Sequence, residues 1–472
     1  MTWPALLLWL IFLLAALQRG SLVIYLFSAT MIFGSITMLP PGRLNLPPQT
    51  VSTIIFIGST FVQRRNLVSA LTLALDVRRL GFLLLFLLCV VPGAIILPRL
   101  FSGLIAVVPL DNTADGVQPI VPTSANLTQA IYITVSVGTA FAFAVRAHDA
   151  RFRAQYLRSI WLTGWLLVAS GVIDLCLTLS GHTSLLSPFH NAHYALLSDV
   201  MEAGQLRVVG FMPEASAYGA ACVSVVSVLI FCFNEFNPIT RRFSLPLVIA
   251  SLIAMIYLST SSTGFVGFII IAAIFLTKVV LRFLVLGRIR LANAIIILGA
   301  VATISAVYLL CMTFDPSFIA ATERLLNAVL FDKTQSSSYV ERSSWTHAGF
   351  EAFIHSYGIG VGVGSVRTSN WLVNLLASTG IIGTTLLGAA IMVSVLAVCR
   401  QRSTEKRRFG YGLVLATVPI GAMMVLSGTT PDPGAFNMAI LGLLTAAGRT
   451  QRTHTEQQIS EDNTMSSVAL PG

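Results

Sequence analysis

The stretch LGFLLLFLLCVVPGAIILP, residues 80–98, contains no charged side chain and is almost entirely apolar. A helix needs about 20 residues to cross a hydrocarbon core about 30 Å thick, so this stretch predicts a membrane-spanning helix. Similar runs recur along almost the whole chain of 472 residues. Backbone polar groups in lipid must be bonded within the protein, and the alternation typical of barrel strands is absent. The sequence therefore predicts an all-α polytopic integral membrane protein.

The composition supports this class. Hydrophobic residues make up 55% of the chain and charged residues only 10%, against roughly 25% charged residues in an ordinary soluble domain, and the mean hydropathy is +0.83. The net charge of +10 is explained by basic residues gathered in alternate connections, as the positive-inside rule requires of cytoplasmic loops, so no nucleic-acid partner is expected. The six cysteines lie within or at the ends of apolar runs, a placement typical of small buried hydrophobes.

The apolar runs predict about 12–13 transmembrane helices in a single domain over residues 1–448. Residues 449–472 are polar and are expected to form a disordered cytoplasmic tail. The N-terminal run lacks the basic residues of a cleaved signal peptide and is interpreted as the first span. The expected spans are 2–17, 21–39, 49–63, 80–98, 127–146, 159–180, 214–233, 243–259, 263–286, 291–312, 371–398, 409–428 and 433–448.

Three long segments are expected on the outer side of the membrane: about 99–126, 181–213 and 313–370. They carry few cations, among them Arg207, Arg342 and Arg367. Since outer loops are usually depleted of cations, the presence of each of these arginines suggests a role other than topology. The outer face is therefore the expected place of function.

The first candidate element is RVVGFMPEAS, residues 207–216. Gly210 and Pro213 interrupt helix, so the segment is expected to bend from the outer loop into a helix beginning near Glu214. Simple helix polarity would place a carboxylate there, because the N-terminus of a helix favours negative charge. The functional alternative is a partly desolvated carboxylate that acts as a general base.

The second candidate element lies in residues 336–370. Apolar residues recur at helical spacing from Arg342 to Phe353 and predict a short amphipathic helix at the membrane surface, with Trp345 and His355 at the headgroup level. The following YGIGVGVGSVR, residues 357–367, lacks the features of a nucleotide-binding loop. It is interpreted either as a nest of backbone N–H groups for an anion, with Arg367 adding positive charge, or as a close-packed glycine segment.

Two weaker signals remain. His190 and His193 have helical i, i+3 spacing but no evident third ligand, so no metal site is predicted. Asp174 lies within an apolar run, where an acid is a functional candidate unless it reaches the interface. Together, Arg207, Arg342, Arg367 and Glu214 favour a lipid-linked phosphate or pyrophosphate, because arginine forks match phosphate oxygens.

Three stretches carry a resemblance to a known family: RVVGFMPEAS, STSSTGFVG at 259–267, and GVGVGSVRTSNWLVNLLASTGIIG at 360–383. Together with the number of expected helices, they resemble the Wzy-type polysaccharide polymerases, which are related to the O-antigen ligases. The likeness covers roughly residues 200–390. An Arg-x10-Gly element often described in the family is not matched by Arg207, and Ser369-Asn370 stands where ligases usually carry His-Asn, which favours the polymerase.

The resemblance implies a bacterial inner-membrane enzyme that joins undecaprenyl-pyrophosphate-linked repeat units at the periplasmic face by inverting glycosyl transfer, without a metal or other cofactor. A chain-length regulator and a flippase are implied as further partners. The expected catalytic residues are Glu214 as base and Arg207, Arg342 and Arg367 as pyrophosphate contacts. Transfer of finished polymer to an acceptor by a ligase is the first alternative, and a polysaccharide or lipid transporter the second. The expected substrate-binding residues are Trp345, His355, Gly362, Gly364, Ser365 and Asn370.

Overall fold

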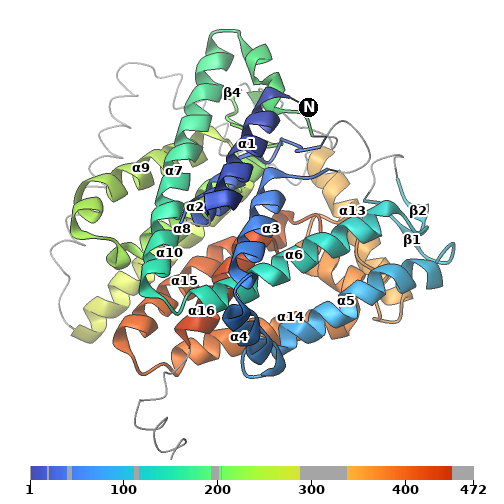
Figure 1. The fold of residues 1–472 in the computed structure, drawn as a ribbon. Coiled ribbons are helices and arrows are strands. Elements are labelled where there is room, and N and C mark those ends of the chain that lie inside the picture. The colour runs from blue at the N-terminus through green and yellow to red at the C-terminus, as the bar shows by residue number, and fades with distance from the viewer. Residues whose placement is uncertain are drawn as a thin grey trace, which may run out of the picture.

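The computed structural model describes residues 2–18, 21–39, 45–110, 116–192, 201–202, 205–286 and 337–448, and most of these are helical. Figure 1 shows long helices packed side by side, with short strands only in the connections. The elements in the first half of the chain are α1 (Trp3–Gln18), α2 (Leu22–Ala29), α3 (Pro48–Phe61), α4 (Arg64–Leu75), α5 (Gly81–Leu100), β1 (Ala106–Val107), β2 (Gln118–Pro119), α6 (Ser124–Arg146), α7 (Ala150–Leu179), β3 (Met201–Glu202) and β4 (Gln205–Leu206).

The second half of the described chain contains only helices: α8 (Ala215–Phe231), α9 (Leu245–Leu258), α10 (Ser262–Leu286), α13 (Ser337–His355), α14 (Trp371–Cys399), α15 (Thr404–Ser427) and α16 (Ala435–Ala447). Short 3-10 turns cover Thr30–Ile32, Thr183–Phe189 and Phe233–Glu235, and a π-helical turn covers Thr240–Ser244. The strands form two antiparallel hairpins, β1–β2 and β3–β4.

Local chemistry explains several of the helix starts. Thr123 and Asn126 form a reciprocal capping box at α6, Asp149 accepts the backbone N–H of Arg151 at the start of α7, and Pro48 occupies the first position of α3. Each device satisfies or removes a backbone donor that the first turn leaves without a helical acceptor.

Seven of the described helices are long and apolar enough to cross a membrane, and four shorter apolar helices accompany them. The chain is thus a multi-pass helical membrane protein, as the apolar runs predict.

Two expectations on individual segments are wrong. Residues 21–39 form only α2 and a 3-10 turn before the helix ends at Ile32, and residues 64–75, expected as a connection, form α4, whose Leu67, Val68 and Leu71 are exposed. The predicted span 291–312 and the tail lie outside the described residues.

The helix α8 lies at the centre of the packing. It contacts α7, α9, α10 and α15, and nearly its whole length belongs to the largest core cluster. Figure 1 shows it enclosed by these neighbours. Of the cysteines, Cys222 and Cys232 are buried in this region, whereas Cys89, Cys176 and Cys399 are exposed on the bundle surface, so the expectation of buried cysteines holds for only two of these five.

The connections divide between the two ends of the bundle. At one end, called here the site end, the described residues 101–110, 116–123, 180–192, 205–214, 356–370 and 428–434 contact one another or neighbouring helix ends. Asn126 Nδ2 donates to the carbonyl of Val363 at 2.8 Å, and Asn374 Nδ2 donates to the carbonyl of Thr429 at 2.9 Å. A small apolar core that includes Val107, Ala352 and Val366 joins the β1–β2 hairpin to α13 and the loop before α14.

Candidate functional site

The carboxylate of Glu214 and the guanidinium of Arg342 meet at the site end. Glu214 Oε2 lies 3.6 Å from Arg342 Nη2, and the two side chains are 31% and 29% exposed. Glu214 precedes the first turn of α8, while Arg342 belongs to α13, far along the chain. The fold therefore joins the two candidate elements that the sequence singled out separately.

The side chain of Glu214 does not cap its helix. Glu214 occupies the N-cap position with extended backbone (φ −157°, ψ 161°), but its carboxylate makes no capping hydrogen bond. One oxygen accepts the Ser216 hydroxyl, and the other faces Arg342. Helix polarity still favours a negative charge here, but the orientation of the carboxylate is set by Arg342 and Ser216.

Arg367 completes the cluster. Its guanidinium carbon lies 4.0 Å from the centroid of the Trp345 ring, which is a cation–π contact. Trp345 belongs to α13, the helix that also carries Arg342. Burial lowers the pKa of Arg367, the carboxylates of Glu341 and Glu214 raise it, and the charge of Arg342 lowers it. These couplings place Arg367 in the electrostatic field of both Glu214 and Arg342. Since an arginine stays protonated at any physiological pH, the cluster holds two fixed cations against a half-buried carboxylate.

Arg207 is connected to this cluster through the bend that leads from β4 to α8. Asp174 of α7 holds the bend: its Oδ2 accepts the backbone N–H groups of Val209 at 2.6 Å and Gly210 at 2.8 Å. The N–H of Val208 donates to the carbonyl of Leu258 at the end of α9, at 3.0 Å. Asp174 is 6% exposed, and its charge is compensated by these backbone donors.

Gly210 and Phe211 fix the shape of the same bend. Gly210 has a φ of +60°, and a Cβ there would lie 2.9 Å from the Tyr218 ring. The Phe211 ring stacks on Phe189, with centroids 4.3 Å apart. The sequence marked Asp174 only as an acid in an apolar run, and its role in holding the bend depends on the packing of α7 against α8.

Replacement of Asp174 by alanine is expected to destabilise the protein and to lower its activity. The substitution leaves two buried N–H groups without an acceptor, at about 1–3 kcal/mol for each, and frees the bend that carries Arg207 and Glu214. Asp174→Asn keeps an acceptor oxygen and should be milder. Melting temperatures of the purified protein measure the difference, with Asp149→Asn, at the start of the same helix, as control. Equal melting temperatures for Asp174→Ala and wild type would contradict this role.

The glycine-rich loop is packed against protein rather than open. Gly358, Gly360, Gly362 and Gly364 all have positive φ. The N–H of Val361 donates to the carbonyl of Ala377 at 2.8 Å, and the N–H of Gly362 to that of Ser378 at 3.0 Å. These carbonyls lie just before Gly380, whose φ of +66° breaks α14. The loop thus supplies hydrogen-bond donors at a break in a helix that the sequence predicts as continuous.

Of the two interpretations of the loop, its packing matches the close-packed glycine segment. A Cβ on Gly362 would lie 2.7 Å from the Pro98 ring, and one on Gly364 would lie 2.4 Å from the carbonyl oxygen of Ala125. Ser365 is 6% exposed and accepts Asn126 Nδ2 at 2.9 Å. Gly362, Gly364 and Ser365, which are expected to bind substrate, are packed in the segment that ends in Arg367.

Gly364→Ala is expected to destabilise the fold strongly, because it combines an unfavourable φ with overlap against α6. The backbone conformation alone costs about 1–3 kcal/mol. Gly103→Ala is the matched control, since Gly103 has a φ of +74° with nothing within 4 Å of its Cβ position. The amount of folded protein on size-exclusion chromatography in detergent measures both, and an equal yield for the two variants would show that the overlap is relieved.

The remaining predicted binding residues divide between the site and its surroundings. Trp345 lies under Arg367 in the cluster. Asn370 caps α14, where its Oδ1 accepts the N–H of Val373 at 3.1 Å. His355 is 63% exposed and lies 3.7 Å from Glu351 one turn earlier in α13, away from Arg342.

His190 lies beside the bend. Burial lowers its pKa, while a hydrogen bond with the Gly210 backbone and the charge of Asp174 raise it. His193, which has i, i+3 spacing to it, lies outside the described residues. Within the described ranges, no group of three His, Cys, Asp or Glu side chains is placed to hold a metal ion.

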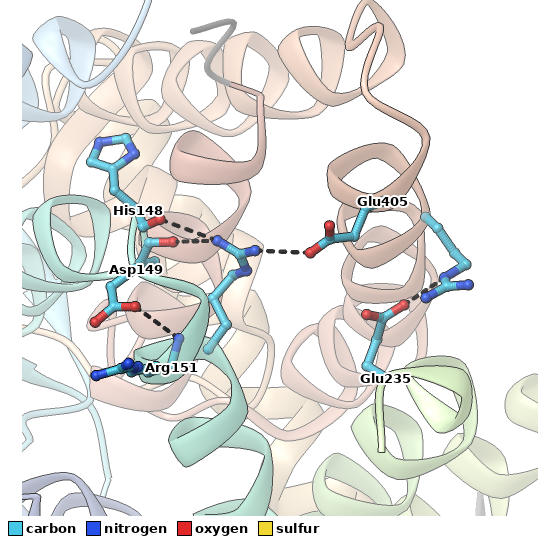
Figure 2. Close-up of polar contacts among 8 residues, drawn as sticks. His148, Asp149, Arg151, Glu235 and Glu405 are labelled. Atoms are coloured by element: carbon cyan, nitrogen blue, oxygen red, sulfur yellow. Dashed lines mark hydrogen bonds and ion pairs between the residues drawn. The ribbon is translucent and has the colours of Figure 1, made fainter. Parts of the chain in front are cut away.

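The opposite end of the bundle carries ion pairs of a different kind (Figure 2). Arg153 of α7 donates to Glu405 of α15 at 3.2 Å, and Arg408 of α15 donates to Glu235, just beyond α8, at 2.7 Å. Glu405 is 67% exposed and Arg408 is 57% exposed. Their partners Arg153 and Glu235 are only 14% and 15% exposed. Each pair therefore has one side chain in solvent, and solvent screens such pairs, which contribute about 0–1 kcal/mol when both partners are exposed. They tie helix ends together and provide controls for the half-buried cluster at the site end.

The fold and the cluster define a multi-pass helical membrane protein with two arginines and a carboxylate gathered at one end of the bundle. Neither a family model nor a curated protein matches the chain.

Proposed function

We propose that the protein polymerises undecaprenyl-pyrophosphate-linked oligosaccharide repeats into a surface polysaccharide. The observation that carries this proposal is the cluster of Glu214, Arg342 and Arg367 at a helix end of a membrane bundle. Two guanidinium groups match the oxygens of a pyrophosphate, and a lipid carrier would bring that pyrophosphate to the membrane edge. The resemblance of residues 200–390 to the Wzy-type polymerases supports the same activity.

In the proposed reaction, a sugar hydroxyl of one lipid-linked saccharide attacks the anomeric carbon of another. The new glycosidic C–O bond forms as the bond to the pyrophosphate oxygen breaks, and in-line attack inverts the anomeric centre. Glu214 takes the hydroxyl proton. Arg342 and Arg367 stabilise the negative charge that develops on the departing pyrophosphate, with Arg207 as a further contact on the bend. The residues of the cluster supply both functions without a metal.

The proposed setting is the bacterial inner membrane, with the site end facing the periplasm and about 12–13 spans in the full chain. The basic connections at the opposite end support this orientation, because positive loops remain in the cytoplasm. Alkaline phosphatase fused after the 101–123 segment should be active, and a fusion within the 400–403 turn should be inactive. The reverse pattern would overturn the orientation.

Deletion of the gene tests the function. The proposal expects surface polysaccharide reduced to single repeat units on a gel, with long chains restored by the wild-type gene. Normal-length polymer left on its lipid carrier would instead identify a ligase. Unchanged chain lengths on the cell surface would overturn both activities. Conversion of lipid-linked repeats by the purified protein in detergent, without any gradient, would exclude a purely transport function.

A further inference from the structure

A cleft runs along the face of α13 that points away from the charged cluster. It has a volume of about 570 Å³ and extends between α13 and the β1–β2 hairpin, which lie side by side in Figure 1. Its volume falls within the range of roughly 300–1,000 Å³ usual for ligand sites. On the helix side the polar lining residues are Tyr339, Ser343, Ser344, His347, Glu351 and His355.

The spacing of these residues shows that α13 has two different faces. Residues three, four or eight positions apart along a helix share a face, so Ser343, His347, Glu351 and His355 form one stripe. Arg342 and Trp345 fall on the other side, where they contact Glu214 and Arg367. At a rise of 1.5 Å per residue, the stripe from Tyr339 to His355 is about 24 Å long.

The lining of the cleft suits a hydroxyl-rich chain. It combines hydroxyl, imidazole and carboxylate groups, which form hydrogen bonds to hydroxyls, with an exposed aromatic ring at Tyr339 and an apolar surface from Ala106, Val117, Val340 and Ala348, against which the C–H faces of sugar rings can pack. Among the described residues that line it there is no arginine or lysine, whereas the opposite face of α13 presents Arg342. The two faces therefore differ in the ligand chemistry that they match: pyrophosphate on one, uncharged polyol on the other.

We infer that this cleft binds the saccharide portion of the growing polymer, beyond the sugars that react at Glu214. The inference rests on the proposed polymerase function and adds a second subsite to it. Because one helix carries both faces, a chain held in the cleft stays close to the pyrophosphate site between additions. The contacts in the cleft slow the release of the polymer and so set how many repeats are added before it leaves.

Filling the cleft tests the inference. Ser343→Trp and Ser344→Trp place a bulky ring in it, while Ser343→Ala and Ser344→Ala remove only a hydroxyl. In the deletion strain, the tryptophan variants are expected to make polymer whose most abundant length is roughly two- to tenfold shorter, the effect on release expected from losing one or two hydrogen bonds. The alanine variants should be intermediate or unchanged. Melting temperatures equal to wild type exclude a folding defect as the cause.

Two results would overturn the subsite without touching the proposed function. Unchanged chain lengths in both tryptophan variants would show that the cleft holds no polymer. Loss of every linkage in stably folded tryptophan variants would place the cleft in bond formation, as expected if the lipid carrier rather than the saccharide lies there. Failure of the proposed function is separate, because the deletion strain itself would then keep its normal polysaccharide.

Discussion

Arg342→Ala is expected to lower the rate of polymer formation about a hundred- to a thousandfold. Removing a group that contacts developing negative charge typically costs about 3–4 kcal/mol of barrier, and Arg342 also pairs with Glu214 at 3.6 Å. Arg342→Lys should rescue poorly, because lysine provides a point charge without the planar fork that matches two phosphate oxygens. Turnover of lipid-linked repeats by the purified variants in detergent measures both effects.

The control for this prediction lies at the other end of the bundle. Arg408→Ala removes a shorter ion pair, with Glu235 at 2.7 Å, but Arg408 is 57% exposed and remote from the site. Its activity should stay within about twofold of wild type, in keeping with the small contribution of surface pairs. Equal losses in Arg342→Ala and Arg408→Ala would contradict a specific role for Arg342.

Glu214→Gln is expected to leave no detectable polymer. The substitution keeps the size and polarity of the side chain but removes the proton acceptor, and general-base catalysis alone typically contributes about 10²–10⁴-fold. The structure strengthens this expectation, since the carboxylate turns toward Arg342 and Ser216 rather than capping α8. Gel analysis of polymer in the complemented deletion strain, normalised to protein in the membrane, provides the measurement.

Glu235→Gln is the matched control for Glu214→Gln, because Glu235 flanks the opposite end of α8 and is also paired with an arginine. It should retain polymer of normal length. Full activity of Glu214→Gln would show that Glu214 does not act as a base and that its position reflects only the preference of helix starts for negative charge. Arg342 and Arg367 would then remain as an anion site without a base.

The helical elements were largely predictable because their signals are local. Spacing from Arg342 to Phe353 predicts an amphipathic helix, and the structure extends it to Ser337–His355. The helix α4 is not predicted from the sequence, because Arg64 and Arg65 at its start are typical of a basic cytoplasmic connection. In the structure its exposed Leu67, Val68 and Leu71 give it an apolar surface that suits the membrane interface.

The glycine-rich loop illustrates what local signals leave open. Glycines with positive φ serve both an anion nest and a close-packed segment, so residues 357–367 alone favour neither. The choice depends on the acceptors that the backbone N–H groups reach. Those acceptors are the carbonyls of Ala377 and Ser378 beside the break at Gly380, which become acceptors for the loop only when it folds back onto α14.

The sequence by itself determined that the protein is a multi-pass helical membrane protein and which residue types are conspicuous at the edges of its helices. Each apolar run meets the requirements of lipid within its own segment, so this information is local. Only the tertiary structure decided that Glu214 meets Arg342, that Arg367 lies over Trp345, and that Asp174 holds the bend of Arg207. These contacts join residues far apart in the chain, and they depend on how α7, α8, α13 and the glycine-rich loop pack together.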